Sequence, residues 1–147
     1  MEIAILGLGC FWGPEVKFSK LDGIIKTEVG YCGGKSSKTN YKEVCSGNTN
    51  HAEVVKIDFD PKIISYEKIL NFFYEIHDPT TLNSQGPDFG SQYRSEIFYF
   101  NDQQKQIAEK ITDEKNNKLS KKVVTKMSLV KNYCPAEEYH QKYLEKR

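Results

Sequence analysis

Apolar residues along the chain follow the spacing of strands in some stretches and that of helices in others. Residues 3–9 are apolar at both odd and even positions, which is typical of a central strand covered on both faces. Residues 52–60 alternate, with Val55, Ile57 and Phe59 on one face and charged residues on the other. Further strands are predicted at residues 24–31, 96–100 and 123–130. Strands are therefore expected in both halves of the chain.

Helical patterns separate these strands. Pro14 suits the first turn of a short helix, Ser65 can cap a helix with a clear apolar stripe, and Asp102 can cap a more polar one. The predicted helices cover residues 13–21, 66–76, 103–119 and 135–146. Strands and helices are mixed without repeats or a linker, which predicts one domain over residues 1–147 with an α+β or mixed α/β two-layer sandwich. The order of the strands does not follow from the pattern.

Composition narrows the functional classes. A formal net charge of +1 gives no electrostatic support for a nucleic-acid partner. No apolar run is long enough to span a bilayer, and the N-terminal residues have the pattern of a strand rather than of a signal peptide. The 4 cysteines are too few for a disulfide scaffold in a chain of 147 residues. We therefore expect a cytoplasmic protein with free thiols and no membrane partner.

Cys10 lies where a buried strand meets the start of a helix, between glycines at positions 9 and 13. The partial positive charge of a helix N-terminus and its unpaired N–H groups favour a thiolate, which is the nucleophilic form of cysteine. Phe11 and Trp12 follow directly and offer an apolar wall. Cys10 is therefore a candidate nucleophile; the alternative is a buried, inert cysteine.

Glu53 shares its strand parity with Val55, Ile57 and Phe59. If these residues face the core, the Glu53 carboxyl is desolvated, which raises its pKa and keeps it neutral. A neutral carboxylic acid can donate a proton near pH 7, which is the role of a general acid. The alternative is a strand-end carboxylate that reaches water.

Other polar side chains leave alternatives open. Tyr41 and Tyr93 stand at the ends of polar loops and could hydrogen-bond a bound oxygen, although most tyrosines are packing residues. The 3 histidines, His51, His77 and His140, lack the spacing of a zinc site. We therefore expect no metal and no cofactor.

One motif, Gly9-Cys10-Phe11-Trp12-Gly13, has a distinctive composition. It looks like the signature of the peptide methionine-(S)-sulfoxide reductase A family (MsrA). Further stretches that resemble this family occur in the family's order along nearly the whole chain, at residues 30–34, 41–47, 51–55, 77–80, 88–95 and 135–141. The signature alone is moderately specific, and the complete set is highly specific.

The resemblance implies an α+β two-layer sandwich around a mixed sheet, related to ferredoxin-like folds. It implies that Cys10 attacks the sulfur of methionine-S-sulfoxide and becomes a sulfenic acid, while Glu53 resembles the acid that protonates the sulfoxide oxygen. The other roles rest on the resemblance alone: Tyr41 and Tyr93 look like the hydroxyls that hold this oxygen, Phe11 and Trp12 like the pocket for the substrate methyl group, and Asp88 like a residue that shapes the site.

The chain departs from the family pattern in its thiols. Many members continue past the terminal helix into a glycine-rich tail with a resolving cysteine, whereas this sequence ends at Arg147. We therefore expect reduction of the sulfenic acid by an external thiol (thioredoxin, glutaredoxin or glutathione), or its resolution by Cys134 or Cys32. Cys45 matches a cysteine without a redox role in the family, so a structural role is expected for it.

The leading hypothesis is a monomeric reductase for methionine-S-sulfoxide, free or in oxidised proteins, which would serve protein repair under oxidative stress. A pocket that distinguishes one methyl group from one oxygen is chiral, so only one epimer should be accepted. Two alternatives stay open. A Cys-His hydrolase would need a histidine beside Cys10, and a non-catalytic module would bind oxidised-methionine peptides without releasing methionine.

Overall fold

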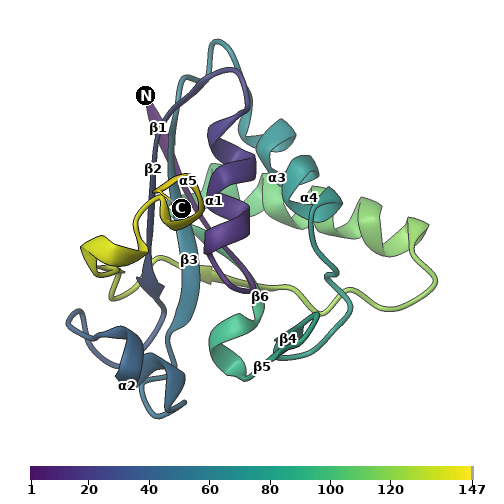
Figure 1. Ribbon diagram of the computed structural model, residues 1–147. Helices are drawn as coiled ribbons and strands as arrows, with labels where there is room; N and C mark the ends of the chain where they lie inside the picture. Colours follow the sequence, from purple (N-terminus) through teal and green to yellow (C-terminus); the bar gives the residue numbers. More distant parts are fainter. Residues whose placement is uncertain (147) are drawn as a thin grey trace.

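The computed structural model describes residues 1–146, and Figure 1 shows a sheet that crosses the molecule with helices beside it. Six strands form this sheet in the order β7-β6-β1-β3-β2-β8. Their bounds are Glu2–Leu8 (β1), Ile24–Cys32 (β2), Ala52–Phe59 (β3), Ser95–Tyr99 (β6), Lys126–Leu129 (β7) and Cys134–Pro135 (β8). The short strands Ser84–Gln85 (β4) and Asp88–Phe89 (β5) pair separately with each other.

The helices within residues 1–146 vary in length from a single turn to 17 residues. The α-helices are Trp12–Ser19 (α1), Tyr41–Cys45 (α2), Tyr66–Glu75 (α3), Asp102–Lys118 (α4) and Tyr143–Lys146 (α5). Two 3₁₀ helices complete the chain, Ser91–Tyr93 (η1) and Glu138–His140 (η2). None of the helices that the structure describes is long and apolar enough to cross a membrane.

Strand β1 lies inside the sheet, with β3 and β6 antiparallel to it on either side. Strand β2 extends the antiparallel pairing beyond β3, and β8 pairs with its outer edge. Strands β6 and β7 run parallel, and α4 connects them, as a parallel pair requires a crossover. This mixed sheet with its helices confirms the predicted α+β class.

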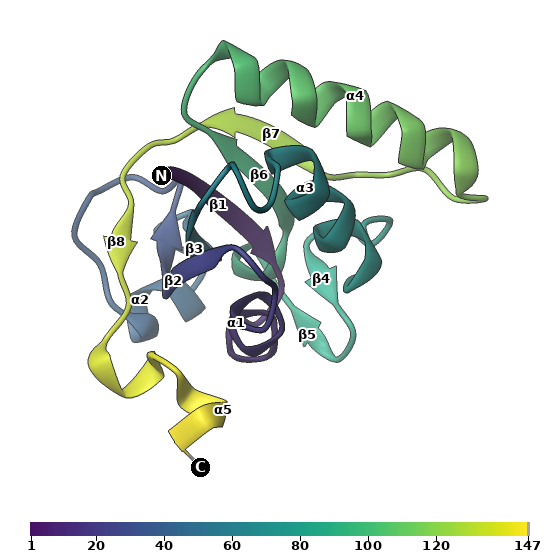
Figure 2. The same ribbon diagram turned by 90° about the horizontal axis from the view of Figure 1, so that it is seen from above.

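Each face of the sheet has its own apolar cluster. In the larger cluster, alternate residues of β1, β3 and β6 such as Leu6, Val55 and Ile97 pack against residues of α1, α3 and α4. Figure 2 shows α1 and α3 on this side of the sheet, with α4 beside α3. The smaller cluster on the other face contains Cys32 and Val54. Because strand residues alternate between the faces, Glu53 belongs to the face that carries the helices.

The predicted helix over residues 135–146 does not form as one continuous helix, because Pro135 belongs to β8 and only Glu138–His140 and Tyr143–Lys146 are helical. The backbone N–H of Ala136 donates to the carbonyl of Val29. The side chain of Gln141 accepts from the N–H of Val29 and donates to its carbonyl, both at 2.9 Å. Unpaired edge groups of a sheet need partners, and here they hold the segment in a partly extended form.

Two smaller predictions also need correction. The cap of α4 is Asn101, whose side chain accepts from the N–H of Gln104, so Asp102 is already helical. The strand predicted over residues 123–130 is limited to the four residues of β7. Both differences concern element ends, where several polar residues compete for the same backbone groups.

Candidate active site

Cys10 lies in the turn between β1 and α1, directly before the helix cap Phe11. The turn depends on Gly9, whose φ of +96° is unfavourable for other residues. The Cys10 side chain is partly buried, and burial raises the pKa of its thiol to about 11. The backbone N–H of Trp12 acts in the opposite direction, as predicted for a helix start. Burial therefore outweighs the effect of the helix start, and the thiol keeps its proton.

Glu53 lies near the start of β3 and is 1% exposed. One carboxyl oxygen accepts from the N–H of Phe11 at 3.3 Å, and the other oxygen has no hydrogen-bond partner among the described residues. Burial raises the pKa of Glu53 to about 8, with a smaller contribution from Asp88, while the N–H of Phe11 lowers it. The carboxyl is therefore mostly protonated at pH 7, and it lies next to the residue that follows Cys10.

Asp88 and two tyrosines belong to the same site. The charge of Asp88, which begins β5, raises the pKa values of both Cys10 and Glu53. Tyr41 begins α2 and Tyr93 ends η1, and each affects the pKa of the other through a side-chain hydrogen bond. Burial is the main cause of the raised pKa of each, which is about 12 for Tyr41. Both hydroxyls are therefore available as donors at neutral pH.

Phe11 and Trp12 differ in how exposed their rings are to solvent, and therefore to a ligand. Phe11 is 1% exposed and its ring packs against Tyr31 and His140, with centroids 5.8 and 5.3 Å apart. Trp12 is half-buried; its indole stacks on Tyr143 with ring centroids 3.9 Å apart. The indole N–H donates to Nδ1 of His140 at 3.1 Å. Only the Trp12 ring is both held in place and partly open to solvent.

The contacts of Trp12 with His140 and Tyr143 could not be predicted from the pattern of the sequence. The hydrogen bond between Trp12 and His140 joins residues 128 positions apart in the sequence. The stack with Tyr143 depends on α5, which brings the end of the chain next to α1. No signal in the sequence pattern connects these segments. The family resemblance at residues 135–141 was the one available indication.

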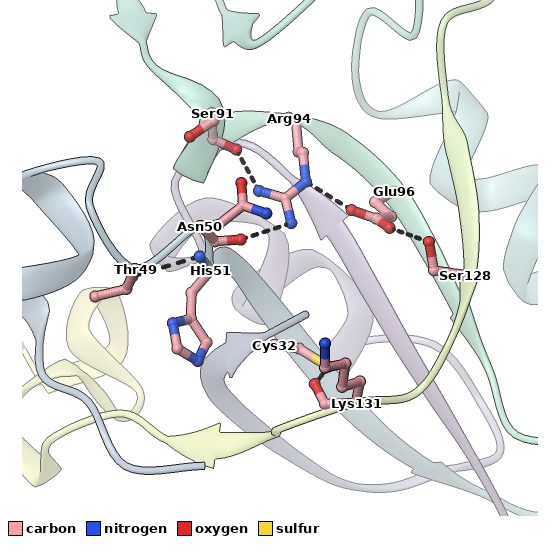
Figure 3. A network of polar contacts seen from close by, with 9 residues as sticks. All are labelled: Cys32, Thr49, Asn50, His51, Ser91, Arg94, Glu96, Ser128 and Lys131. Carbon is pink, nitrogen blue, oxygen red and sulfur yellow. Dashed lines mark hydrogen bonds and ion pairs between the residues drawn. The ribbon is translucent and has the colours of Figure 1, made fainter. Parts of the chain in front are cut away.

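A buried network fixes two of the chain segments that build the site (Figure 3). The Arg94 guanidinium pairs with Glu96 at 2.6 Å and donates to the backbone carbonyls of Ser91 and Asn50, at 2.8 and 3.0 Å. Glu96 also accepts from the hydroxyl of Ser128 at 2.6 Å. The network thus connects η1, which ends at Tyr93, with the loop that enters β3 just before Glu53, and anchors both to β6 and β7.

Of the two cysteines considered for resolving a sulfenic acid, Cys32 lies on β2 and Cys134 on β8. Cys32 is fully buried in the cluster on the opposite face of the sheet, where its thiol donates to the carbonyl of Lys131 at 3.3 Å. Cys134 stands opposite Tyr31 in the pairing of β8 with β2, so β2 separates it from Glu53 on β3. Cys45, by contrast, is exposed at the end of α2, so it has no structural role in the core.

His51 and His77 have separate hydrogen-bond partners and do not form a common site. His51 contacts the carbonyl of Ser36, and His77 contacts the carbonyl of Phe73 and the hydroxyl of Ser95. Residues 1–146 contain no group of three or more metal-binding side chains. None of the groups that shift the pKa of Cys10 is a histidine. His140 packs against Phe11, but its Nδ1 accepts from the Trp12 indole rather than from Cys10, which argues against the arrangement of a Cys-His hydrolase.

A partly buried thiol, a neutral carboxylic acid and two tyrosine hydroxyls gathered on an α+β fold define a class of protein: enzymes that act through a cysteine thiol. Comparison with known proteins gives the family. The family model for peptide methionine sulfoxide reductase matches residues 2–147. A protein of Pelagibacter ubique described as "Peptide methionine sulfoxide reductase MsrA" is 80% identical over 147 residues, which cover all of both chains.

Solved structures agree with this match. The reduced form of Mxr1 from Saccharomyces cerevisiae superposes with a TM-score of 0.95 and 43% identity, covering 99% of this chain and 85% of that one. A structure of Mxr1 in complex with Trx2 matches with a TM-score of 0.69 and 28% identity, covering 97% and 84% of the two chains. The chain belongs to the peptide methionine sulfoxide reductase family, as the sequence motifs predict, and is an oxidoreductase.

Proposed function

We propose that this enzyme reduces methionine-S-sulfoxide, free and peptide-bound, by attack of Cys10 on the sulfoxide sulfur with Glu53 as the proton donor. The observation that carries the proposal is the buried Glu53 carboxyl, whose pKa of about 8 keeps it protonated at neutral pH, bonded to the residue beside Cys10. Membership of the family supports the substrate class. Protein repair in the cytoplasm, by a monomer, is the corresponding biological role.

In the proposed step the Cys10 sulfur attacks the sulfur of the substrate while Glu53 gives its proton to the sulfoxide oxygen. The attack forms a bond between the two sulfur atoms, and the bond between the protonated oxygen and the methionine sulfur breaks. The hydroxyl group then bonds to the Cys10 sulfur as the sulfur–sulfur bond breaks, so methionine is released and Cys10 becomes a sulfenic acid. Cys10 is oxidised by two electrons and methionine is reduced by two. The proton that Cys10 loses restores the acid, so the step needs no net supply of protons. A protonated donor is required because oxygen is a poor leaving group without a proton.

The remaining site residues orient the substrate in this proposal. The hydroxyls of Tyr41 and Tyr93 donate to the sulfoxide oxygen, which carries partial negative charge and is stabilised by such donors. The half-buried Trp12 ring, fixed by His140 and Tyr143, receives the methyl group. An oxygen side and a methyl side make the site chiral, which supports the restriction to the S epimer.

The test is a single turnover without any added reductant. The protein is incubated with a small excess of the S or the R epimer of N-acetylmethionine sulfoxide, and the sulfide product is measured. We expect one equivalent of product per Cys10 from the S epimer and none from the R epimer. Cys10→Ser should form none from either. Binding without product formation would instead support the non-catalytic module, and comparable reduction of the R epimer would contradict the proposed pocket.

We further propose that an external thiol regenerates the enzyme, with thioredoxin as the reductant. Support comes from the yeast relative Mxr1, whose structure was determined in complex with Trx2. Glutaredoxin and glutathione are the alternative donors. Multiple-turnover assays with each of the three reductants distinguish them, and turnover that needs glutathione and ignores thioredoxin would overturn this assignment.

A further inference from the structure

Helix α2 carries two reactive side chains toward the site. Its first and last residues, Tyr41 and Cys45, are four positions apart and therefore lie on the same side of the helix. The Tyr41 ring packs against His140 with centroids 4.6 Å apart, and His140 packs against Phe11, the neighbour of Cys10. The face of α2 that holds Cys45 is thus the face that borders the site.

The electrostatics of the site agree with this placement. Electrostatic interactions with Glu53, Asp88 and Cys45 each raise the pKa of Cys10. Cys45 also raises the pKa of Tyr93. Neither of the other two cysteines acts on Cys10. Among the cysteines of the described residues, Cys45 is therefore the one whose electrostatic interaction affects the pKa of Cys10.

Helix α2 is held at both ends, and Cys45 is exposed at the second of them. The N–H of Tyr41 donates to the Glu137 carboxylate at 3.1 Å, and Glu137 also accepts from the hydroxyl of Tyr31 at 2.8 Å. Val44 is the only buried residue among the five of the helix, whereas Cys45 is exposed. A disulfide needs its two Cα atoms within about 7 Å, so the bond proposed below requires Cys10 and Cys45 to approach each other to this distance.

We propose that Cys45 is the resolving cysteine of this enzyme and that its thiol condenses with a sulfenic acid on Cys10. This inference rests on the proposed function, because only the proposed first step forms that sulfenic acid. In the resolving step the Cys45 sulfur attacks the Cys10 sulfur, so that an S–S bond forms and the S–O bond breaks. The hydroxyl group leaves as water with the proton of the Cys45 thiol. No other oxidant is needed.

Regeneration then follows from the exposure of Cys45. A dithiol protein attacks the exposed Cys45 sulfur by thiol–disulfide exchange, and Cys10 leaves as a thiol in its reduced form. The second thiol of the same donor completes the exchange, restores Cys45 and oxidises the donor to a disulfide. A partly buried sulfenic acid on Cys10 would be harder for a protein donor to reach, which gives the intermediate disulfide its advantage.

The experiment maps every cysteine after one turnover of the full chain. Trypsin places the four cysteines in separate peptides, residues 1–17, 27–35, 43–56 and 132–142. The wild type, Cys45→Ser and the control Cys134→Ser are each mixed with N-acetylmethionine-S-sulfoxide without reductant. Remaining thiols are then alkylated, sulfenic acid is trapped with dimedone, and sulfide product is measured in the same samples.

We expect the wild type and Cys134→Ser to lose two thiols per sulfide formed and to yield peptide 1–17 linked to peptide 43–56. Cys45→Ser should lose one thiol per sulfide and yield peptide 1–17 with the dimedone adduct. The inference would be overturned if the wild type yielded no disulfide between peptides 1–17 and 43–56, or if Cys45→Ser still lost two thiols per sulfide. Either result would leave the reduction of the sulfoxide intact. Absence of sulfide in every sample would instead refute the proposed function itself.

Discussion

At the scale of single residues, the behaviour of Glu53 follows from where it stands on β3. Its parity with Val55 and Ile57 turns the carboxyl toward the helical face, and the partner strands exclude water from it. One hydrogen bond from Phe11 offsets only part of this desolvation, so the pKa rises. This burial could be predicted from alternation alone, because period two fixes the face of every residue in a strand.

The raised pKa of Glu53 makes a prediction about stability. The folded protein holds the Glu53 proton up to a pKa of about 8, whereas the unfolded chain releases it near 4.5. A folded-state pKa above the unfolded value means that stability is lost as pH rises from about 4.5 to about 8. Glu53→Gln has no such titration. Its stability relative to the wild type should therefore increase by roughly 4–5 kcal/mol across this interval.

Urea denaturation of both proteins between pH 4 and pH 9 measures this difference. All other titrating groups are common to the two proteins and largely cancel in the comparison. A difference that stays constant with pH would mean that the Glu53 carboxyl is not desolvated in the folded protein.

A second prediction concerns the oxygen-binding hydroxyls. Tyr93→Phe removes one donor to the sulfoxide oxygen, and a lost hydrogen bond to a charged oxygen corresponds to about tenfold or more in kcat/KM. Tyr99→Phe is the matched control, because Tyr99 lies in β6 and its ring contacts Lys105 rather than the site. Steady-state kinetics of the two variants make the comparison. Equal values for both would remove Tyr93 from the oxygen-binding role.

At the scale of elements, the site depends on how short segments are attached to the sheet. The terminal segment was predicted as a helix, yet its backbone pairs with the free edge of β2. An edge strand is a property of the assembled sheet, and local spacing of apolar residues carries no information about it. For the same reason the support of Trp12 by Tyr143 and the position of Cys45 beside the site could not be read from the pattern.

The buried Arg94–Glu96 ion pair helps to hold these elements in place. Glu96→Gln keeps the shape of the side chain but leaves the Arg94 guanidinium buried, 8% exposed, without its counter-charge. We expect a loss of about 3 kcal/mol of stability, as is typical when one partner of a buried pair is removed. Glu67→Gln, which breaks the solvent-exposed pair with Lys110, is the matched control and should change stability by less than about 1 kcal/mol.

Urea denaturation at pH 7 compares these two variants with the wild type. Losses of equal size would show that burial adds nothing to the energy of the Arg94–Glu96 pair.

At the scale of the whole molecule, the site gathers segments that are distant in sequence at one end of the sheet. Figure 1 shows α2, β4 and β5 grouped at this end. The fold class and most strands followed from the pattern, because apolar periodicity reports which face of an element is buried. Strand order did not, since pairing partners are chosen by the assembled chain. The relation to ferredoxin-like folds stays a prediction.

The central claim is that Glu53 acts as the acid in a reaction that Cys10 begins. The most direct measurement is the single-turnover rate constant with N-acetylmethionine-S-sulfoxide, for the wild type and for Glu53→Gln, between pH 5 and pH 10. Because Glu53 raises the pKa of Cys10, that pKa is measured in each protein from the pH dependence of thiol alkylation, and the rate constants are corrected for it before their ratio is taken. At pH 7 we expect the wild type to be faster by about 10²–10⁴, the usual contribution of a general acid.

The acid form of Glu53 exists below its pKa of about 8, so the ratio of wild-type to variant rate constants should be constant at lower pH. Above pH 8 the ratio should fall about tenfold per pH unit as the carboxyl loses its proton. A ratio near one, or a ratio that does not change up to pH 10, would contradict the account.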